Sequence, residues 1–82
     1  MRELSDTIPF ILDDVDCELR RATELYGPMN SSHEAYAIIA EELDEFWDLV
    51  RQKDVGTEEM RKELIQVAAM ACRAVYDICA ED

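Results

Sequence analysis

The chain has 82 residues, of which 49% are hydrophobic, and it carries 20 acidic against 8 basic side chains, for a formal net charge of -12. Nucleic acids are polyanions that bind to clustered Lys and Arg, so this balance argues against direct binding of DNA or RNA and against acidic membrane surfaces. The hydrophobic content excludes a disordered acidic tail, and two glycines and two prolines are too few for a fold of many short strands.

The first predicted helix covers residues 8–26. Asp6 or Thr7 can cap its start, and Pro9 suits a first turn, where its missing N–H breaks no helical hydrogen bond. Gly27, followed by a proline, ends the helix in the way that is usual at a C-terminus. Its apolar residues recur at helical spacing, in one stripe formed by Ile8, Ile11, Leu12, Val15, Leu19, Ala22 and Tyr26. The pattern therefore predicts an amphipathic helix with one buried side.

Two further helices are predicted over residues 32–53 and 58–80. Ser31 and Glu34 have the spacing of a capping box, and Thr57 can cap the third helix. The connections between the helices are only a few residues long, so consecutive helices should pack antiparallel. We therefore expect a single all-α domain over the whole chain, built as an antiparallel bundle of three main helices.

The cysteines bear on the cellular compartment. Cys72 and Cys79 would lie two turns apart on one helix, about 10 Å, which is too far for a disulfide. We expect Cys17, Cys72 and Cys79 to be reduced and mostly buried thiols, as in cytoplasmic proteins. The apolar run at residues 8–12 is too short for a signal peptide or a membrane span. The sequence thus favours a cytoplasmic protein without a membrane partner.

The second predicted helix places carboxylates on its apolar side. With a rotation of about 100° per residue, Glu42 and Glu45 fall in the same arc as Ile38, and Glu41 lies at its edge, whereas Asp44 points to the opposite side. Burying two like charges one turn apart is unfavourable unless a cation compensates them, and carboxylate oxygens are the ligands that Mg²⁺ and Mn²⁺ prefer. The alternative is a solvated face, or one paired with arginine.

The third predicted helix offers one more carboxylate. Glu63 lies at the edge of its apolar face, so in an antiparallel pair it could face Glu42 and Glu45 across the bundle. Such an arrangement would complete a metal site built from facing helices. The alternative is an exposed glutamate near the start of the helix, where the helix dipole favours negative charge.

Both long helices carry more apolar surface than one neighbour can cover. The residues that widen the apolar arcs are Ile39, Leu43, Trp47 and Val50 on the second helix and Ile65, Ala69, Cys72, Tyr76 and Cys79 on the third. We therefore expect oligomerisation to complete the bundle, as a homodimer or as a homotetramer made of two dimers, with these helices in the interface. The alternative is that the first helix suffices and Trp47 is simply exposed.

A family resemblance rests on the acidic helix. Segment 33–48, HEAYAIIAEELDEFWD, resembles the first motif helix of the MazG-like nucleotide pyrophosphohydrolases, members of the all-α NTP pyrophosphatase superfamily. The pattern of that family is EExxE, then a spacer, then ExxD on the next helix. Glu41, Glu42 and Glu45 match the first part of this pattern.

The second motif is matched with one departure. Glu63 begins it, within KELIQVAAMA at residues 62–71, but its closing Asp is replaced by Gln66. Glutamine offers a carbonyl oxygen to a metal ion and carries no charge. The resemblance covers about residues 30–80, most of the chain.

The resemblance implies a hydrolase that cleaves a nucleoside triphosphate between its α- and β-phosphates, releasing a monophosphate and pyrophosphate. It implies a Mg²⁺ cofactor, or Mn²⁺, which would bridge the acidic protein to the phosphates and help to activate a water molecule. The metal ligands that it implies are Glu41, Glu42, Glu45, Glu63 and Gln66. Of these, Glu41 or Glu42 would be catalytic, orienting the attacking water as a base.

Candidate contacts to the nucleobase are Tyr26, His33 and Tyr36, by stacking or hydrogen bonding. His33 taken alone is typical of a surface histidine in the first turn of a helix. Two other functions stay open. One is a helical binding or regulatory module that has kept the fold and lost turnover, which Gln66 favours. The other is an acidic mimic that occupies a basic partner surface, suggested only by the net charge.

Overall fold

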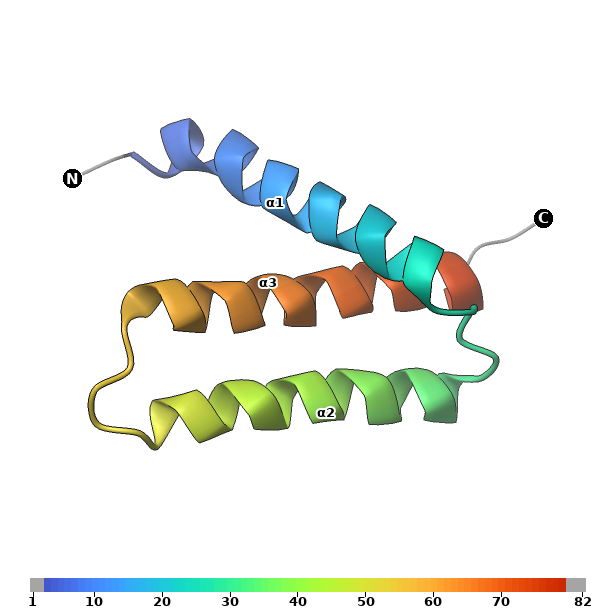
Figure 1. Cartoon of the computed structure of the whole chain (residues 1–82). Helices are drawn as coiled ribbons and strands as arrows, with labels where there is room; N and C mark the ends of the chain where they lie inside the picture. The colour runs from blue at the N-terminus through green and yellow to red at the C-terminus, as the bar shows by residue number, and fades with distance from the viewer. Residues whose placement is uncertain (1–2, 80–82) are drawn as a thin grey trace.

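The computed structural model describes residues 3–79 and contains helices and no strand in that range (Figure 1). The helices are α1 (Leu4–Leu25), α2 (Ser32–Val50) and α3 (Thr57–Ala74), and α3 continues into a π-helical turn, η1 (Val75–Cys79). The predicted all-α fold is confirmed: three helices pack together, and α3 contacts both of the others.

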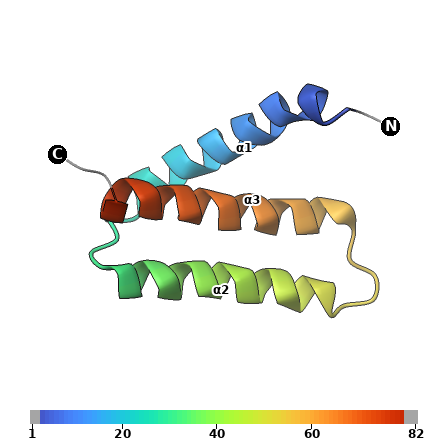
Figure 2. The ribbon, with the colours of Figure 1, turned by 180° about the vertical axis from the view of Figure 1, so that it is seen from behind.

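The helix α3 lies between α1 and α2, as the front and rear views show (Figures 1 and 2). It runs beside α2 along its whole length and in the opposite direction, as the short connection predicts. The helix α1 meets the C-terminal end of α3 and diverges from it toward its own N-terminus. An ion pair between Arg61 and Asp14 spans the two helices. The α2–α3 pair is therefore the closer of the two packings, and it is the pair that positions the acidic residues.

The start of α1 differs from the prediction. The helix begins at Leu4, with Glu3 as an N-cap whose side chain makes no capping bond, so neither Asp6 nor Thr7 is the cap. Thr7 instead donates its hydroxyl hydrogen bond to the Glu3 carbonyl, at 3.0 Å. Pro9 lies in the interior of the helix and not in its first turn. At this interior position the missing N–H of the proline removes one helical hydrogen bond. The prediction failed because a proline near the start of a helix marks the first turn only on average.

The predicted cap of α2 is confirmed. The Ser31 hydroxyl oxygen accepts from the Glu34 backbone N–H at 3.0 Å. In return, the Glu34 carboxylate accepts from the backbone and side-chain N–H groups of Asn30, at 3.1 and 3.2 Å, one residue earlier than in a standard capping box. The helix ends at Val50, three residues before the prediction, and Arg51 pairs with Asp48 across the last turn at 2.6 Å. These local bonds fix where the acidic helix begins and ends.

The ends of α3 also differ slightly from the prediction. Gly56 is the N-cap and Thr57 the first helical residue, one position from the expected cap. Regular α-helix ends at Ala74 and the wider π-turn follows, whereas the predicted end at residue 80 lies outside the described residues. The Asp77 carboxylate of this turn accepts from the Met29 backbone N–H at 2.9 Å, so the end of α3 holds the loop between α1 and α2.

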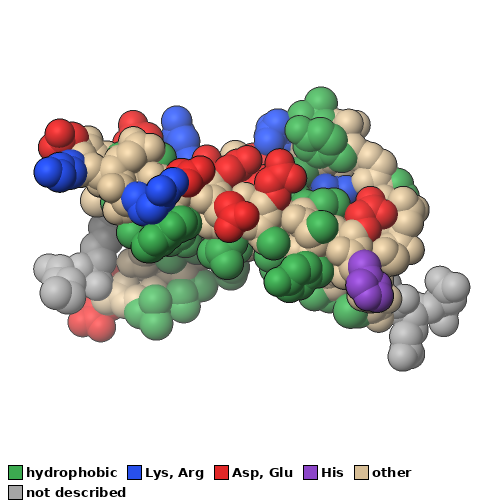
Figure 3. Space-filling model, turned by 90° about the horizontal axis from the view of Figure 1, so that it is seen from below, with side chains coloured by type: hydrophobic (Ala, Val, Ile, Leu, Met, Phe, Trp, Pro, Cys, Tyr) green, Lys and Arg blue, Asp and Glu red, His purple; other side chains and the backbone are tan. Residues whose placement is uncertain are grey.

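The buried core is small. Its members lie on all three helices and the first loop: Val15, Ala22, Met29, Ala35, Ala69 and Met70. Many large apolar side chains are exposed, among them Phe10, Tyr36, Trp47 and Tyr76. The space-filling view shows such apolar side chains beside acidic ones on the face that α2 presents (Figure 3). A core of this size is marginal for a chain of 82 residues.

Two further expectations concern the surface. Cys17, Cys72 and Cys79 are free and exposed, so the prediction of mostly buried thiols is wrong. In the single chain α1 diverges from α3 and leaves much of the apolar surface open, so the side of α3 that carries Cys72 and Cys79 has no covering element among the described residues. Within residues 3–79, no helix is both long and apolar enough to cross a lipid bilayer.

Candidate metal centre

A group of three acidic side chains joins α2 and α3. Glu42, Glu45 and Glu63 each place one carboxylate oxygen within 4.8 Å of the others. Glu42 and Glu45 lie one turn apart on α2, and the antiparallel α3 brings Glu63 against them. Glu42 and Glu63 are half-buried and Glu45 is exposed. The sequence prediction that these three residues meet is therefore confirmed, although Glu45 lies at the rim and not inside.

Two oxygens in this group lack a partner. Oε2 of Glu42 and Oε2 of Glu63 are buried and accept no hydrogen bond from the part of the chain that the structure describes. A buried acceptor without a partner costs about 1–3 kcal/mol, and more if it is charged. None of the four ion pairs within residues 3–79 involves Glu42, Glu45 or Glu63. Within the described range the group therefore has no ion-pair partner, and the one arginine that attracts Glu42 from a distance, Arg21, is itself paired with Glu18.

The pKa values of Glu42 and Glu63 are raised, as expected for carboxylates that lie close together and are partly buried. Burial, followed by repulsion from Glu45 and Glu63, raises the pKa of Glu42 from 4.5 to about 7. Burial and the neighbouring Glu45 also raise the pKa of Glu63. Near neutral pH a proton therefore competes for the place that a cation would take. Raised carboxyl pKa values of this kind are common at functional sites.

The geometry suits a hard divalent cation. The donors are carboxylate oxygens, which Mg²⁺ and Mn²⁺ prefer over softer ligands. Oxygens from two helices converge within 4.8 Å, so one ion could contact all three side chains. A bound cation would satisfy the two oxygens without partners and lower the repulsion among the three carboxylates.

The other two predicted metal ligands lie further out. Glu41 is exposed and adds a small repulsion to Glu42, so it is a neighbour of the cluster. Gln66 is half-buried and lines a hollow between α1 and α3, together with Glu18 and Arg61. The structure thus brings three of the five predicted ligands together, keeps Glu41 beside them and turns Gln66 toward α1.

The three residues predicted to contact the nucleobase do not lie in one site. Tyr26 is exposed and lines a hollow of about 490 Å³ that also contains Glu41 and Glu42. His33 and Tyr36 are exposed on α2 and line neither this hollow nor its neighbour. Of the three, only Tyr26 shares a cavity with predicted metal ligands.

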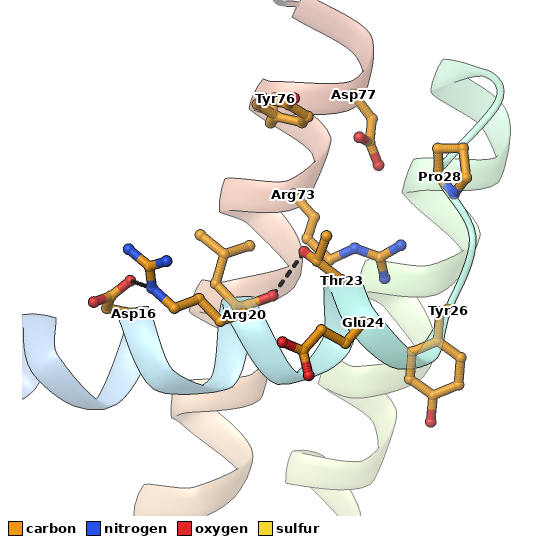
Figure 4. A pocket seen from close by; sticks show the side chains of 10 residues that line it. Asp16, Arg20, Thr23, Glu24, Tyr26, Pro28, Arg73, Tyr76 and Asp77 are labelled. Atoms are coloured by element: carbon orange, nitrogen blue, oxygen red, sulfur yellow. Dashed lines mark hydrogen bonds and ion pairs between the residues drawn. The ribbon is translucent and has the colours of Figure 1, made fainter.

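Arg73 was missed by the sequence reasoning. It is the only charged or polar residue that is buried within residues 3–79, with 5% of its surface exposed. Its guanidinium Nη2 donates to the Gly27 carbonyl at 2.6 Å, and Nη1 approaches the Met70 sulfur at 3.7 Å. It lines the hollow that contains Glu42 and a second hollow of about 550 Å³, drawn in Figure 4. Its position on a flank of α3 gave no signal of this burial, because the covering loop is distant in sequence.

In comparisons with known proteins, no family model, no characterised sequence and no solved structure matches this chain. The sequence motifs and the site geometry are therefore what bears on its function. They establish a small all-α protein of three helices with a carboxylate cluster that could hold a metal ion.

Proposed function

We propose that this protein is a Mg²⁺-dependent nucleoside triphosphate pyrophosphohydrolase that releases a monophosphate and pyrophosphate. The observation that carries the proposal is the group formed by Glu42, Glu45 and Glu63, with two buried oxygens that accept no hydrogen bond from residues 3–79. The MazG-like motif pattern supports the same assignment, because these glutamates are the ones that the pattern places on the metal. Mn²⁺, which accepts the same donors, is the alternative cofactor.

The three clustered glutamates would hold the ion, and Glu41 would complete the acidic set at the edge of the hollow. When bound, the metal would polarise a phosphoryl oxygen and offset the charge that develops during phosphoryl transfer. A chain of net charge -12 repels a nucleotide, so a cation is also needed to bring the two together. Gln66 stands where the motif has an Asp, so the site has one carboxylate fewer than the pattern.

The water that attacks the phosphate needs a base. Glu41 is exposed, lies beside Glu42 and lines the same hollow, so its carboxylate can reach solvent that enters there. We assign it the orientation of the attacking water. Glu42 is the more buried of the two and is better suited to hold the metal.

Tyr26 is the strongest candidate for contact with the nucleobase, because it lines the hollow that contains Glu41 and Glu42. Its exposed ring offers a surface for stacking. His33 and Tyr36 lie outside the hollow, so in this proposal they contact the base only if a second copy of the chain brings them to it.

The proposal includes a homodimer. Tyr36, Leu43, Trp47 and Val50 are exposed to 76%, 52%, 56% and 41%. With the half-buried Ala40 they alternate at spacings of four and three residues along α2, the pattern of a seam between two packed helices. A second copy would cover this seam, and a homotetramer would need a further surface. Light scattering at micromolar concentration should give twice the mass of the chain, and Trp47→Glu should give the monomer. A monomeric wild-type protein would refute this part.

The alternative function is a binding or regulatory module without turnover. The observation that favours it is Gln66 in place of the acidic residue of the motif, on the side of α3 that faces α1. Such a module would bind a metal ion and a nucleotide and would release no pyrophosphate.

One assay separates the two functions. The protein is incubated with canonical and modified nucleoside triphosphates and Mg²⁺ or Mn²⁺, and the released pyrophosphate is measured. The variants Glu42→Gln and Glu45→Gln should lose the activity. Asp44→Asn, which removes the same charge from the far side of α2, should keep it. If the wild-type protein releases no more pyrophosphate than Glu42→Gln on any substrate, the enzyme proposal is rejected, and retained metal binding would then favour the module.

A further inference from the structure

Arg73 differs from every other described arginine. Arg20, Arg21, Arg51 and Arg61 each pair with a carboxylate. Arg73 is the most buried charge within residues 3–79, yet no carboxylate oxygen of that range lies within 4.0 Å of its guanidinium. A buried charge without an opposite charge is unfavourable, and here it occurs in a chain with a large excess of acidic residues.

The contacts that Arg73 does make leave much of its bonding capacity unused. A guanidinium carries five N–H donors in a planar fork. One nitrogen donates to the Gly27 carbonyl, and another approaches the Met70 sulfur, which is a weak acceptor. The bond to Gly27 holds the loop between α1 and α2, but it neutralises no charge. Loop anchoring therefore accounts for part of the guanidinium, and no carboxylate of residues 3–79, including that of Asp77 in the neighbouring hollow, forms an ion pair with it.

The place of Arg73 indicates where that partner would come from. Arg73 lines the hollow of about 490 Å³ that also contains Glu41 and Glu42, at the edge of the carboxylate cluster. It lines the neighbouring hollow as well, and the two hollows share Tyr26 and Pro28. The close-up shows the guanidinium extending from α3 toward the end of α1 and the loop that carries Pro28 (Figure 4). The same hollow thus presents negative oxygens on one part of its wall and a buried cation on another.

We infer that Arg73 binds a phosphate group of the ligand in the hollow that it shares with Glu41 and Glu42. A simple anion would be repelled by the carboxylates of that hollow. A phosphate that binds together with a divalent cation is compatible with both kinds of residue in the hollow. The cation would contact the glutamates, and the phosphate oxygens would accept hydrogen bonds from the guanidinium. The planar fork of arginine matches two phosphate oxygens at once. This inference rests on the proposed function for the metal, and it adds a residue that the motif pattern does not contain.

A binding experiment tests the inference without requiring turnover. Mn²⁺ alone is titrated first, and then inorganic pyrophosphate in the presence and in the absence of Mn²⁺. Arg73→Met should keep the affinity for Mn²⁺ within about twofold and weaken the binding of pyrophosphate with Mn²⁺ by roughly 10- to 100-fold, the usual effect of losing a hydrogen bond to a charged group. Arg73→Lys, which keeps the charge and loses the fork, should lie between Arg73→Met and the wild type.

Asp77 supplies the matched control. Its carboxylate holds the same loop through the Met29 N–H but adds no positive charge. Asp77→Ala should therefore leave pyrophosphate binding within about threefold of the wild type, a change of well under 1 kcal/mol. Equal losses in Arg73→Met and Asp77→Ala would show that Arg73 only anchors the loop, and wild-type affinity in Arg73→Met would also overturn the inference. If Arg73→Met does not fold, Arg73→Lys decides by the same comparison.

The two proposals can fail separately. If the wild-type protein binds no Mn²⁺, the metal centre is rejected. If it binds Mn²⁺ but binds no pyrophosphate with or without the metal, the role of Arg73 is rejected and the metal centre stands.

Discussion

Replacing Glu42 with Gln should have opposite effects on the free energy of unfolding without and with a divalent metal. The pKa of Glu42 is about 7 in the folded protein against an ordinary value of 4.5. Between these values the folded state binds more protons than the unfolded state, so stability falls as the pH rises through this window. Each pKa unit corresponds to 1.36 kcal/mol, which sets an upper limit of roughly 3 kcal/mol at pH 8. Glu42 is only half-buried, so solvent screening should reduce this to about 1–2 kcal/mol.

Glutamine has nearly the shape of the protonated glutamate and cannot ionise. At pH 8 without metal, Glu42→Gln should therefore be about 1–2 kcal/mol more stable than the wild type, and near pH 4.5 the two proteins should be equal. For a chain of this size, 1 kcal/mol shifts the melting temperature by roughly 4–8 °C. Mn²⁺ at about 100 times its Kd should stabilise the wild type by about 2.7 kcal/mol, and the variant should gain far less.

Urea unfolding at pH 4.5 and pH 8, with Mn²⁺ or with a chelator, measures these free energies, and thermal melts under the same conditions measure the shift in melting temperature. Asp44→Asn is the control, because it removes the same charge from an exposed position on α2. Its stability should change little, and it should keep the full response to Mn²⁺. If Glu42→Gln is less stable than the wild type at pH 8 without metal, or if Asp44→Asn behaves in the same way as Glu42→Gln, ionised Glu42 does not destabilise the folded protein through burial and repulsion.

Three further predictions concern the fold and the site. Met70→Ala removes a buried side chain of the core and should lower the free energy of unfolding by about 2–4 kcal/mol in urea, whereas truncation of the exposed Leu64 should cost less than half as much. Ser31→Ala removes the cap of α2 and should cost about 1 kcal/mol, and an unchanged melting curve would contradict the capping bond. A proton must leave Glu42 before a metal binds, so the apparent affinity for Mn²⁺ should fall by about tenfold per pH unit below pH 7, and a flat profile in calorimetry between pH 5 and pH 7 would contradict this coupling.

The sequence predicted those features that depend on local bonds and on helical periodicity. The cap at Ser31 needs only a serine and the backbone three residues later. Glu42 and Glu45 meet Glu63 because the helical periodicity places all three toward the apolar sides of α2 and α3. The short connection between these two helices then leaves little choice but antiparallel packing. The start of α1 was misplaced because Pro9 is tolerated inside that helix, a choice that local rules do not decide.

The features that were missed depend on how distant segments pack. Arg73 is buried because the loop at Gly27 covers it, more than forty residues away in sequence. Gln66 and Glu63 belong to one helix that has a partner on each side, and periodicity alone did not indicate that Gln66 faces α1. Cys72 was expected to be buried because its side of α3 is apolar, but an apolar face is not buried until some element covers it.

The proposed metal centre requires that Glu42, Glu45 and Glu63 together hold one divalent cation. Crystals grown or soaked with Mn²⁺ test it directly, by anomalous diffraction recorded near the manganese absorption edge. A shared metal site should give one strong anomalous peak among the three carboxylates, with metal–oxygen distances of about 2.0–2.3 Å, as is usual for hard divalent cations in oxygen sites. A peak elsewhere on the molecule, or none at saturating Mn²⁺, would contradict the metal centre.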